Sequence, residues 1–308
     1  MTAVIETSHL SKWYGNVLGL SDVSIEVEPG ISGLLGPNGA GKSTFLKLLT
    51  GQIRPSIGNV RIFGQKVINN PSLFYRIGFC PEHDSFYEDM TGWVFLTSLL
   101  RLHGFSPAET RARAEKALEI VDLSADKDRL VRAYSRGMRQ RLKFAQAIAH
   151  DPEIIILDEP MSGLDPLGKR KLIRLIKAYK EEGKTVIVSS HVLPEIEALT
   201  RNIILIHQGK VFARGDIHYI RDLIETHPHM VAVKCADPRG LAGQLIGEDY
   251  VLQVHFGPDA RSLLVETSNR DQFFARLLSL LVKSKMEVEE ISSPDDNLQA
   301  VFEYLVGK

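Results

Sequence analysis

The sequence predicts an α/β domain with a largely parallel sheet, followed by a small α+β domain. Short runs of aliphatic and β-branched residues, bounded by turn residues, alternate with helical stretches as far as about residue 215. After that point the order becomes strand, helix, two strands, helix and strand, which is the order of a ferredoxin-like unit. A chain of 308 residues is long enough for two domains, and we place them at residues 1–215 and 216–308.

The first domain has clear helix and strand signals. Ser106, the proline after it and Glu109 form a capping pattern, which predicts a helix running to about Asp122. Asp165 followed by proline opens another helix, which ends near Gly183. The predicted strands are Val23–Val27, Gly33–Leu35, Ile154–Leu157, Thr185–Ser189 and Ile203–His207.

The second domain is predicted in more detail from residue 217 onward. Its helix at residues 270–283 carries an apolar stripe that we expect to pack in a core, namely Phe273, Phe274, Leu277, Leu278, Leu280 and Leu281. This domain has fewer basic than acidic residues, so it repels phosphate and is not where a nucleotide binds. The expected elements are a helix at 217–224, strand 230–234, helix 238–245, strands 250–256 and 261–266, helix 270–283, strand 286–291 and a helix at 297–305.

Composition excludes several classes of protein. Hydrophobic residues make up 44% and charged residues 24% of the chain, which are values of an ordinary globular protein. The formal net charge of −1 argues against a dedicated nucleic-acid binder. No apolar run approaches the roughly 20 residues that span a bilayer, so we expect any membrane role to come through a partner. Two cysteines, Cys80 and Cys235, form no disulfide framework, which predicts a reduced, intracellular setting.

A glycine-rich segment lies between a predicted strand and a predicted helix. Glycines let the backbone turn tightly, so several N–H groups point at one anion, and the following helix adds its positive end. A lysine there supplies charge for the β- and γ-phosphates, and a hydroxyl can ligate Mg²⁺. The segment therefore predicts a nucleotide site. It fits G-x-x-x-x-G-K-[ST] through Gly36, Pro37, Asn38, Gly39, Ala40, Gly41, Lys42 and Ser43, and Thr44 follows in the helix.

Two carboxylates follow the strand predicted at Ile154–Leu157. A wholly apolar strand that ends in acids is typical of a buried parallel strand whose carboxyl end opens at the ligand edge of the sheet. Asp158 is placed to hold Mg²⁺ through water, and Glu159 is placed to polarise the attacking water as a general base. Either acid alone also suits a core strand that ends in solvent, but the phosphate loop favours the catalytic interpretation.

Five further segments occur in the order in which ATP-binding cassette (ABC) proteins carry their motifs, and the resemblance covers about residues 3–215. It assigns Tyr14 to the aromatic that stacks on adenine and residues 77–82 to the Q-loop. Residues 134–140, with Ser135, Arg136 and Gly137, correspond to the Leu-Ser-Gly-Gly-Gln signature. Residues 160–165 correspond to the D-loop, and His191 to the switch histidine.

The resemblance implies the fold, the activity and the partners. It implies a P-loop NTPase cassette that hydrolyses ATP, with a helical subdomain at about residues 84–150. In this family two cassettes, identical or different, meet head to tail, and the signature of one contacts the ATP held by the other. His191 would then donate to the γ-phosphate, and a hydroxyl and a bare backbone at the start of the signature helix suit an anion.

Two positions depart from the commonest family pattern. Glu82 stands where glutamine is usual, so it either ligates the metal more strongly or repels the γ-phosphate and slows closure. Arg136 replaces the first glycine of the signature, and its guanidinium either bonds the partner's nucleotide or points to solvent. We expect hydrolysis to be retained, since Lys42, Asp158 and Glu159 are present together with the histidine.

Two functions from different classes follow from the resemblance. The first is the ATPase subunit of an exporter of the drug- and lipid-exporter group, peripheral on the inner face of the cell membrane and bound to a membrane-spanning subunit. We expect an aromatic cluster that includes Phe86, Tyr87 and Trp93 to expose at least Phe86 or Tyr87 as the docking surface. The second is a soluble ABC-type ATPase that remodels a protein or ribonucleoprotein assembly. A single cassette without coiled-coil heptads favours the first.

Overall fold

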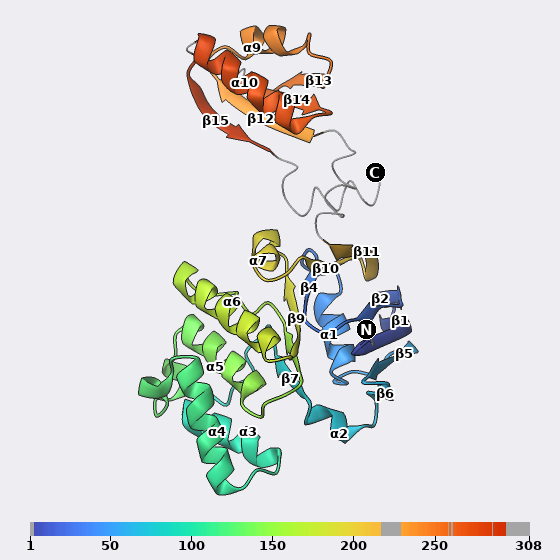
Figure 1. Ribbon diagram of the computed structural model, residues 1–308, viewed down its shortest axis with the longest axis vertical. Coiled ribbons are helices and arrows are strands. Elements are labelled where there is room, and N and C mark those ends of the chain that lie inside the picture. Colours follow the sequence, from blue (N-terminus) through green and yellow to red (C-terminus); the bar gives the residue numbers. More distant parts are fainter. Residues whose placement is uncertain (1–2, 217–228, 258, 260, 285, 294–308) are drawn as a thin grey trace. The chain divides into compact units, whose positions relative to one another are not determined.

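The computed structural model describes residues 3–216, 229–257, 259, 261–284 and 286–293 (Figure 1). The chain divides into two units, residues 1–217 and 218–308. Within the described residues, no helix is both long enough and apolar enough to cross a bilayer. The first unit contains β1 (Ile5–Tyr14), β2 (Val17–Val23), β3 (Glu26–Val27), β4 (Ile31–Leu35), α1 (Lys42–Leu49), β5 (Ile57–Ile62), β6 (Gln65–Lys66), α2 (Pro71–Phe74), β7 (Ile77–Cys80), α3 (Gly92–Leu102), α4 (Pro107–Ile120), α5 (Arg136–Ile148), β8 (Ile154–Leu157), α6 (Pro166–Glu181), β9 (Thr185–Ser190), α7 (Leu193–Glu197), β10 (Asn202–His207) and β11 (Lys210–Asp216).

A six-stranded sheet forms the centre of the first unit, in the order β11-β10-β4-β9-β8-β7. Its strands pair in parallel from β10 to β7, and β11 adds an antiparallel edge. The inner strands β4, β8 and β9 are buried along their whole length, as expected when both faces of a parallel sheet are covered. The carboxyl ends of these strands meet at one edge, which is where the glycine-rich loop begins.

A second sheet, antiparallel, orders β2-β1-β5-β6, with β3 also pairing with β1. Helix α1 is packed between the two sheets, because its apolar residues share one buried cluster with residues of both (Figure 1). Phe45 and Leu46 of α1 are almost fully buried there beside Ile5 of β1 and Ile204 of β10. This packing fixes the amino end of α1, and therefore the glycine-rich loop, against the sheet edge.

Helices α3, α4 and α5 form a helical layer at the other end of the unit (Figure 1). Ser106 caps α4 in a complete capping box with Glu109, as the sequence predicts. Helix α5 packs closely on β7: a Cβ on Gly78 would lie 1.9 Å from the carbonyl oxygen of Ala147, so only glycine fits. Leu142 of α5 is fully buried.

In the described part of the second unit, four strands form an antiparallel sheet in the order β13-β14-β12-β15. The helices α9 and α10 pack on it around one apolar core that includes Phe273, Leu277 and Val265. This order and connectivity match the ferredoxin-like unit that the sequence predicts. Its elements are β12 (His229–Cys235), α9 (Pro238–Leu245), β13 (Val251–Phe256), β14 (Ser262–Thr267), α10 (Arg270–Ser284) and β15 (Val288–Ser292).

Two expectations about these elements are wrong. The strand predicted at residues 23–27 is divided between the end of β2 and the short β3, because the Ile25 N–H donates to the Thr7 hydroxyl and not to a strand carbonyl. Leu278 is 56% exposed and is not in the core of the second unit, since it lies on the outer side of α10 from Leu277. The helices expected at 217–224 and 297–305 lie outside the described residues.

Candidate nucleotide site

The glycine-rich loop leaves the end of β4 and enters α1 through Gly41. Gly41 is the N-cap of α1 with φ +105°, and a Cβ at that position would lie 2.7 Å from the carbonyl oxygen of Gly19. Lys42 begins the helix and is only 6% exposed. Its ammonium donates to the carbonyl oxygens of Gly36 at 2.7 Å and Pro37 at 3.2 Å, so the lysine is folded over its own loop.

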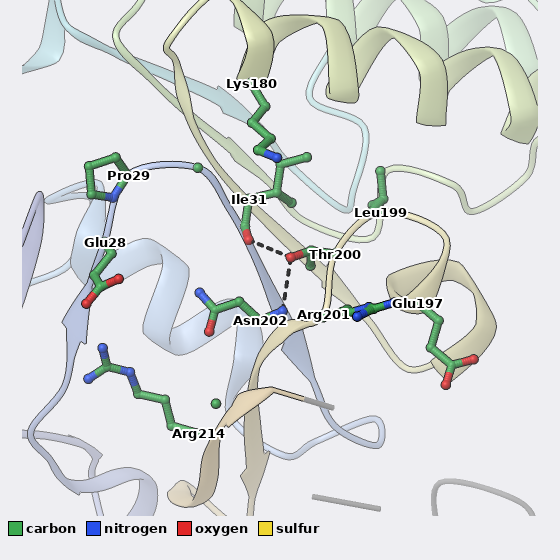
Figure 2. Close-up of a pocket in the computed structure, with 12 residues that line it drawn as sticks. Glu28, Pro29, Ile31, Lys180, Glu197, Leu199, Thr200, Arg201, Asn202 and Arg214 are labelled. Atoms are coloured by element: carbon green, nitrogen blue, oxygen red, sulfur yellow. Dashed lines mark hydrogen bonds between the residues drawn. The ribbon is translucent and has the colours of Figure 1, made fainter. Parts of the chain in front are cut away.

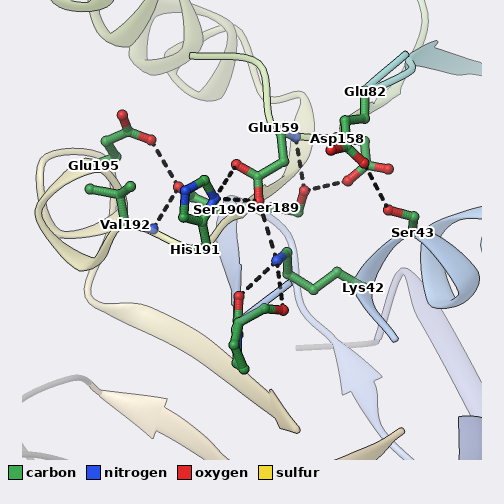
Figure 3. Close-up of polar contacts among 12 residues, drawn as sticks. Lys42, Ser43, Glu82, Asp158, Glu159, Ser189, Ser190, His191, Val192 and Glu195 are labelled. Atoms are coloured by element: carbon green, nitrogen blue, oxygen red, sulfur yellow. Dashed lines mark hydrogen bonds and ion pairs between the residues drawn. The ribbon is translucent and has the colours of Figure 1, made fainter. Parts of the chain in front are cut away.

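Glu159 lies directly opposite that lysine. It follows β8 and has φ +47°, a left-handed conformation that is uncommon outside glycine and that often marks a functional residue. Its buried carboxylate lies 3.2 Å from Lys42 Nζ and 3.0 Å from His191 Nδ1 (Figure 3). The structure therefore brings together all of the catalytic residues that the sequence predicts, from the start of α1 and from the ends of β8 and β9.

Ser189, near the end of β9, joins the two acidic residues and was not found by sequence reasoning. Its hydroxyl donates to Asp158 Oδ1 at 2.6 Å and accepts from the backbone N–H of Glu159 at 2.9 Å (Figure 3). It is fully buried, so both bonds form away from water and are costly to leave unmade. Two serines, Ser189 and Ser190, at the carboxyl end of an otherwise mostly apolar strand were the available signal.

The oxygen atoms expected to hold Mg²⁺ gather beside this cluster. Ser43 Oγ donates to Glu82 Oε2 at 3.5 Å, and Asp158 is 2% exposed with its carboxylate facing the same side (Figure 3). The described residues contain no group of three His, Cys, Asp or Glu side chains that would cage a metal by itself. A hydroxyl and two carboxylates fit Mg²⁺, which prefers oxygen ligands and takes the rest of its shell from phosphates and water.

The two cysteines take no part in this chemistry. Both are free and buried. Cys80 ends β7 next to the predicted Q-loop, and burial raises the pKa of its thiol to about 12. It is therefore a neutral packing group rather than a thiolate nucleophile or ligand.

Tyr14 lies near the start of α1, as an adenine-stacking role requires. Its ring is 46% exposed and covers Gly19, where a Cβ would lie 2.9 Å from Tyr14 Cε2 and 3.5 Å from Thr44 Oγ1. The ammonium of Lys12 lies 5.4 Å from the centre of the same ring. A flat, half-exposed aromatic beside the phosphate loop is suited to stacking on a base.

The signature residues lie apart from this cluster. Ser135 is the N-cap of α5, where its hydroxyl accepts from the N–H of Met138 at 3.2 Å, and both Ser135 and Arg136 are exposed. Helix α5 and helix α1 cover opposite faces of the parallel sheet (Figure 1). Gln140 of α5 donates to the carbonyl of Pro160 at 2.8 Å, which ties this helix to the D-loop. The signature is therefore presented to solvent rather than to the phosphate loop of its own chain.

A separate cavity of about 870 Å³ lies at the opposite edge of the parallel sheet (Figure 2). Ile31 and Asn202, at the amino ends of β4 and β10, line it together with Thr200, whose hydroxyl donates to the Ile31 carbonyl at 2.8 Å. Ligands of open α/β sheets bind at the carboxyl ends of the strands, and none of the predicted site residues borders this cavity. We therefore do not assign the nucleotide to it.

The predicted docking cluster is partly exposed. Tyr87 is 68% exposed, whereas Phe86 is half-buried with its ring 5.0 Å from that of Phe95. Trp93 is also half-buried, under the ammonium of Lys127. The expectation that at least one of the first two rings is exposed is confirmed for Tyr87.

The fold and the cluster around Lys42 define a P-loop nucleotide hydrolase that holds its phosphate loop and two acidic residues at one sheet edge. The sequence profile described as "ABC transporter" matches residues 20–162. The chain belongs to the ABC transporter family, as an ATP-binding cassette of its exporter-type group. This is the family that the motifs predicted.

Three curated relatives illustrate that group. The chain is 32% identical to the daunorubicin/doxorubicin resistance ATP-binding protein DrrA of Streptomyces peucetius, over 99% of this chain and 93% of that protein. It is 33% identical to the bacitracin transport ATP-binding protein BcrA of Enterococcus faecalis, over 100% and 97%. It is 35% identical to the Nod factor export ATP-binding protein I of Cupriavidus metallidurans, over 72% and 74%. These relatives give no support to the alternative of a soluble remodelling ATPase.

Two solved structures resemble the first unit. The ATP-binding subunit of an ABC transporter superposes with a TM-score of 0.66 at 30% identity, over 72% of this chain and 93% of that one. A dimeric, post-hydrolysis ATP-binding cassette bound to ADP and Pi superposes with a TM-score of 0.64 at 25% identity, over 69% and 98%. Both matches cover nearly all of the solved structure but only part of this chain, which agrees with a cassette that is followed by an additional unit.

Proposed function

We propose that this chain hydrolyses MgATP at the cluster around Lys42, with the roles that the sequence assigned. The loop amides of residues 36–41 and the ammonium of Lys42 bind the phosphates, and Tyr14 stacks on the adenine. Ser43, Glu82 and Asp158 hold Mg²⁺, which neutralises phosphate charge when bound. The observation that carries the proposal is the buried contact of Glu159 with both Lys42 and His191 at the carboxyl edge of the sheet.

In this arrangement Glu159 takes a proton from the attacking water. The carboxylate is positioned by its backbone bond to Ser189 and by the left-handed turn after β8. His191, which contacts the same carboxylate and is partly exposed, donates to the γ-phosphate. Because a buried ion pair is stable only when both partners remain paired, the triphosphate must replace Glu159 as the counter-charge of Lys42. ATP binding thereby frees the base for catalysis.

We further propose that two copies of this chain meet head to tail around two ATP molecules. Ser135, Arg136 and Gly137 bind the nucleotide of the opposite copy through the hydroxyl, the backbone and the positive end of α5. A single chain carries both halves of such a site, so two copies are sufficient to complete two sites. The exposed signature and the dimeric cassette among the structural relatives support this arrangement.

The cassette is proposed to dock on a membrane-spanning subunit and to power export from the inner face of the cell membrane. The names of the relatives include drug resistance, bacitracin transport and Nod factor export. Tyr87, which precedes α3, and Val94 of α3 are both exposed, and we propose that they contact this partner. The transported substrate would be recognised by that other subunit.

Fractionation of cells that produce the chain tests this proposal. The wild-type protein is expected in the membrane fraction, and a Tyr87→Asp/Val94→Asp double variant is expected in the supernatant. Ile57, which is 60% exposed on the antiparallel sheet, supplies the control: Ile57→Asp should leave the distribution unchanged. Wild-type protein that stays in the supernatant beside its membrane subunit would contradict the docking proposal.

A further inference from the structure

Lys143 is a buried cation that the mechanism above does not use. It lies in the middle of α5, three residues after the signature segment, and is 3% exposed. Its ammonium donates to the backbone carbonyl of Glu82 at 2.6 Å and lies 3.2 Å from the carboxylate of Asp84. Both partners belong to the segment that follows β7, and that segment carries the proposed Mg²⁺ ligand.

A buried ammonium cannot release such partners cheaply. The Asp84 carboxylate is 40% exposed but the ammonium is buried, so loss of its partners would leave a buried positive charge unpaired. The short bond to the Glu82 carbonyl is also charge-assisted, a class roughly twice as strong as a neutral hydrogen bond. Lys143 therefore fixes the main chain of Glu82 itself, and not only a nearby surface side chain.

Arg139 secures the same segment one turn earlier on α5. Its guanidinium lies 2.8 Å from Glu88 and 3.6 Å from Asp84, which Lys143 also contacts. Residues four apart lie on one face of a helix, so two cations of α5 hold the segment along one side. The Glu82 side chain remains 40% exposed and reaches across to Ser43. The main chain of Glu82 is fixed while its carboxylate faces the site.

We infer that Lys143 is a positioning residue that sets the Glu82 carboxylate opposite Ser43 and so determines how strongly Mg²⁺ tightens nucleotide binding. The inference rests on the proposed role of Glu82 as a Mg²⁺ ligand. Residues that orient a metal ligand typically contribute 10–100-fold to metal affinity. Mg²⁺ also demands near-ideal geometry, so a ligand displaced even slightly loses much of its effect.

The test measures the dissociation constant of a fluorescent ATP analogue for the full chain, once with Mg²⁺ and once with EDTA. The ratio of the two constants isolates the contribution of the metal and needs no turnover. Lys143→Met keeps the length of the side chain and removes its charge. We expect the ratio to fall about tenfold in Lys143→Met, with the EDTA value within about twofold of wild type. Lys143→Arg should restore much of the ratio.

Glu82→Gln shows whether Lys143 acts through that carboxylate. Glu82→Gln alone should lower the ratio, and adding Lys143→Met to it should cause no further loss, because residues that act as a unit are not additive. The control is Lys184→Met, which removes an ion pair with Asp151 at the opposite edge of the sheet and should leave the ratio unchanged.

Two results would overturn the inference. One is an unchanged ratio in Lys143→Met while Glu82→Gln lowers it. The other is that Lys143→Met lowers the ratio equally in the wild-type chain and in the Glu82→Gln chain. An unchanged ratio in Glu82→Gln would refute the Mg²⁺ role of Glu82 and the inference together. Should Lys143→Met not fold, Asp84→Asn weakens the same contact at a side chain that is 40% exposed. Its ratio should also fall, and no change there would likewise refute the inference.

Discussion

Replacing Glu159 by glutamine separates its catalytic role from its structural one. Glutamine has nearly the same volume, so the turn after β8 and the bond from the Glu159 N–H to Ser189 are retained. The change removes the charge that lies 3.2 Å from Lys42 and the oxygen that can accept a proton. A general base contributes about 10²–10⁴-fold, so we expect kcat to fall by at least a hundredfold, a barrier increase of about 3 kcal/mol or more.

The same substitution should leave ATP binding intact or make it tighter. Glu159 lies 3.2 Å from Lys42 and so competes with the triphosphate for this lysine, and glutamine is a weaker competitor because it carries no charge. Phosphate release gives kcat, and titration with a fluorescent ATP analogue gives the affinity. A kcat within threefold of wild type, whether or not KM is raised, would refute the general-base role.

Glu153 provides the matched control for this experiment. It precedes β8, at the other end of the strand from Glu159, and pairs with Arg76 while its side chain is 52% exposed. Surface ion pairs contribute about 0–1 kcal/mol, so Glu153→Gln should change turnover by less than about twofold.

Three further predictions concern binding, packing and pH. Tyr14→Ala should weaken ATP about tenfold through loss of stacking, whereas Tyr14→Phe should bind normally in the same titration. Gly78→Ala should lower the unfolding free energy by about 3 kcal/mol in urea because its Cβ would strike the Ala147 carbonyl; Gly243→Ala, in open space, should not. Burial and the neighbouring His103 lower the pKa of His150 from its ordinary value of 6.5 to about 4. The neutral form therefore stabilises the fold above pH 6.5, and this contribution is lost as the pH falls toward 4. Urea unfolding should show about 2 kcal/mol less stability at pH 5 than at pH 7.5, and His150→Gln should abolish that part of the difference.

The sequence was most informative where local chemistry leaves few alternatives. The capping box at Ser106 and the apolar strand before Asp158 were placed within a few residues, since both depend on adjacent residues. The phosphate loop was equally predictable, because its glycines are needed where a Cβ would strike neighbouring atoms, as at Gly41. The pairing between strands was harder to predict, so the division of residues 23–27 between β2 and β3 was missed.

Contacts between distant segments could not be predicted. Lys143 reads in the sequence as an ordinary lysine of an amphipathic helix, and only the fold places it under the carbonyl of Glu82. Ser189 likewise gains its role from the register of β8 beside β9, which brings it to Asp158. Leu278 shows the converse: its apolar side chain fitted the predicted stripe, but the width of the buried face leaves it exposed.

The central proposal, that each ATP is shared by two chains, is tested most directly by mixing two inactive variants. Lys42→Ala removes the phosphate-binding lysine. Gly137→Asp places a negative charge at the signature, where a Cβ has no atom nearer than 3.8 Å and therefore fits the single chain. On random pairing about half of the dimers are mixed. In each mixed dimer one of the two sites combines an intact loop with an intact signature, so the mixture should recover up to about a quarter of the wild-type ATPase activity. Activity no greater than the sum of the two variants alone would show that a single chain completes its own site.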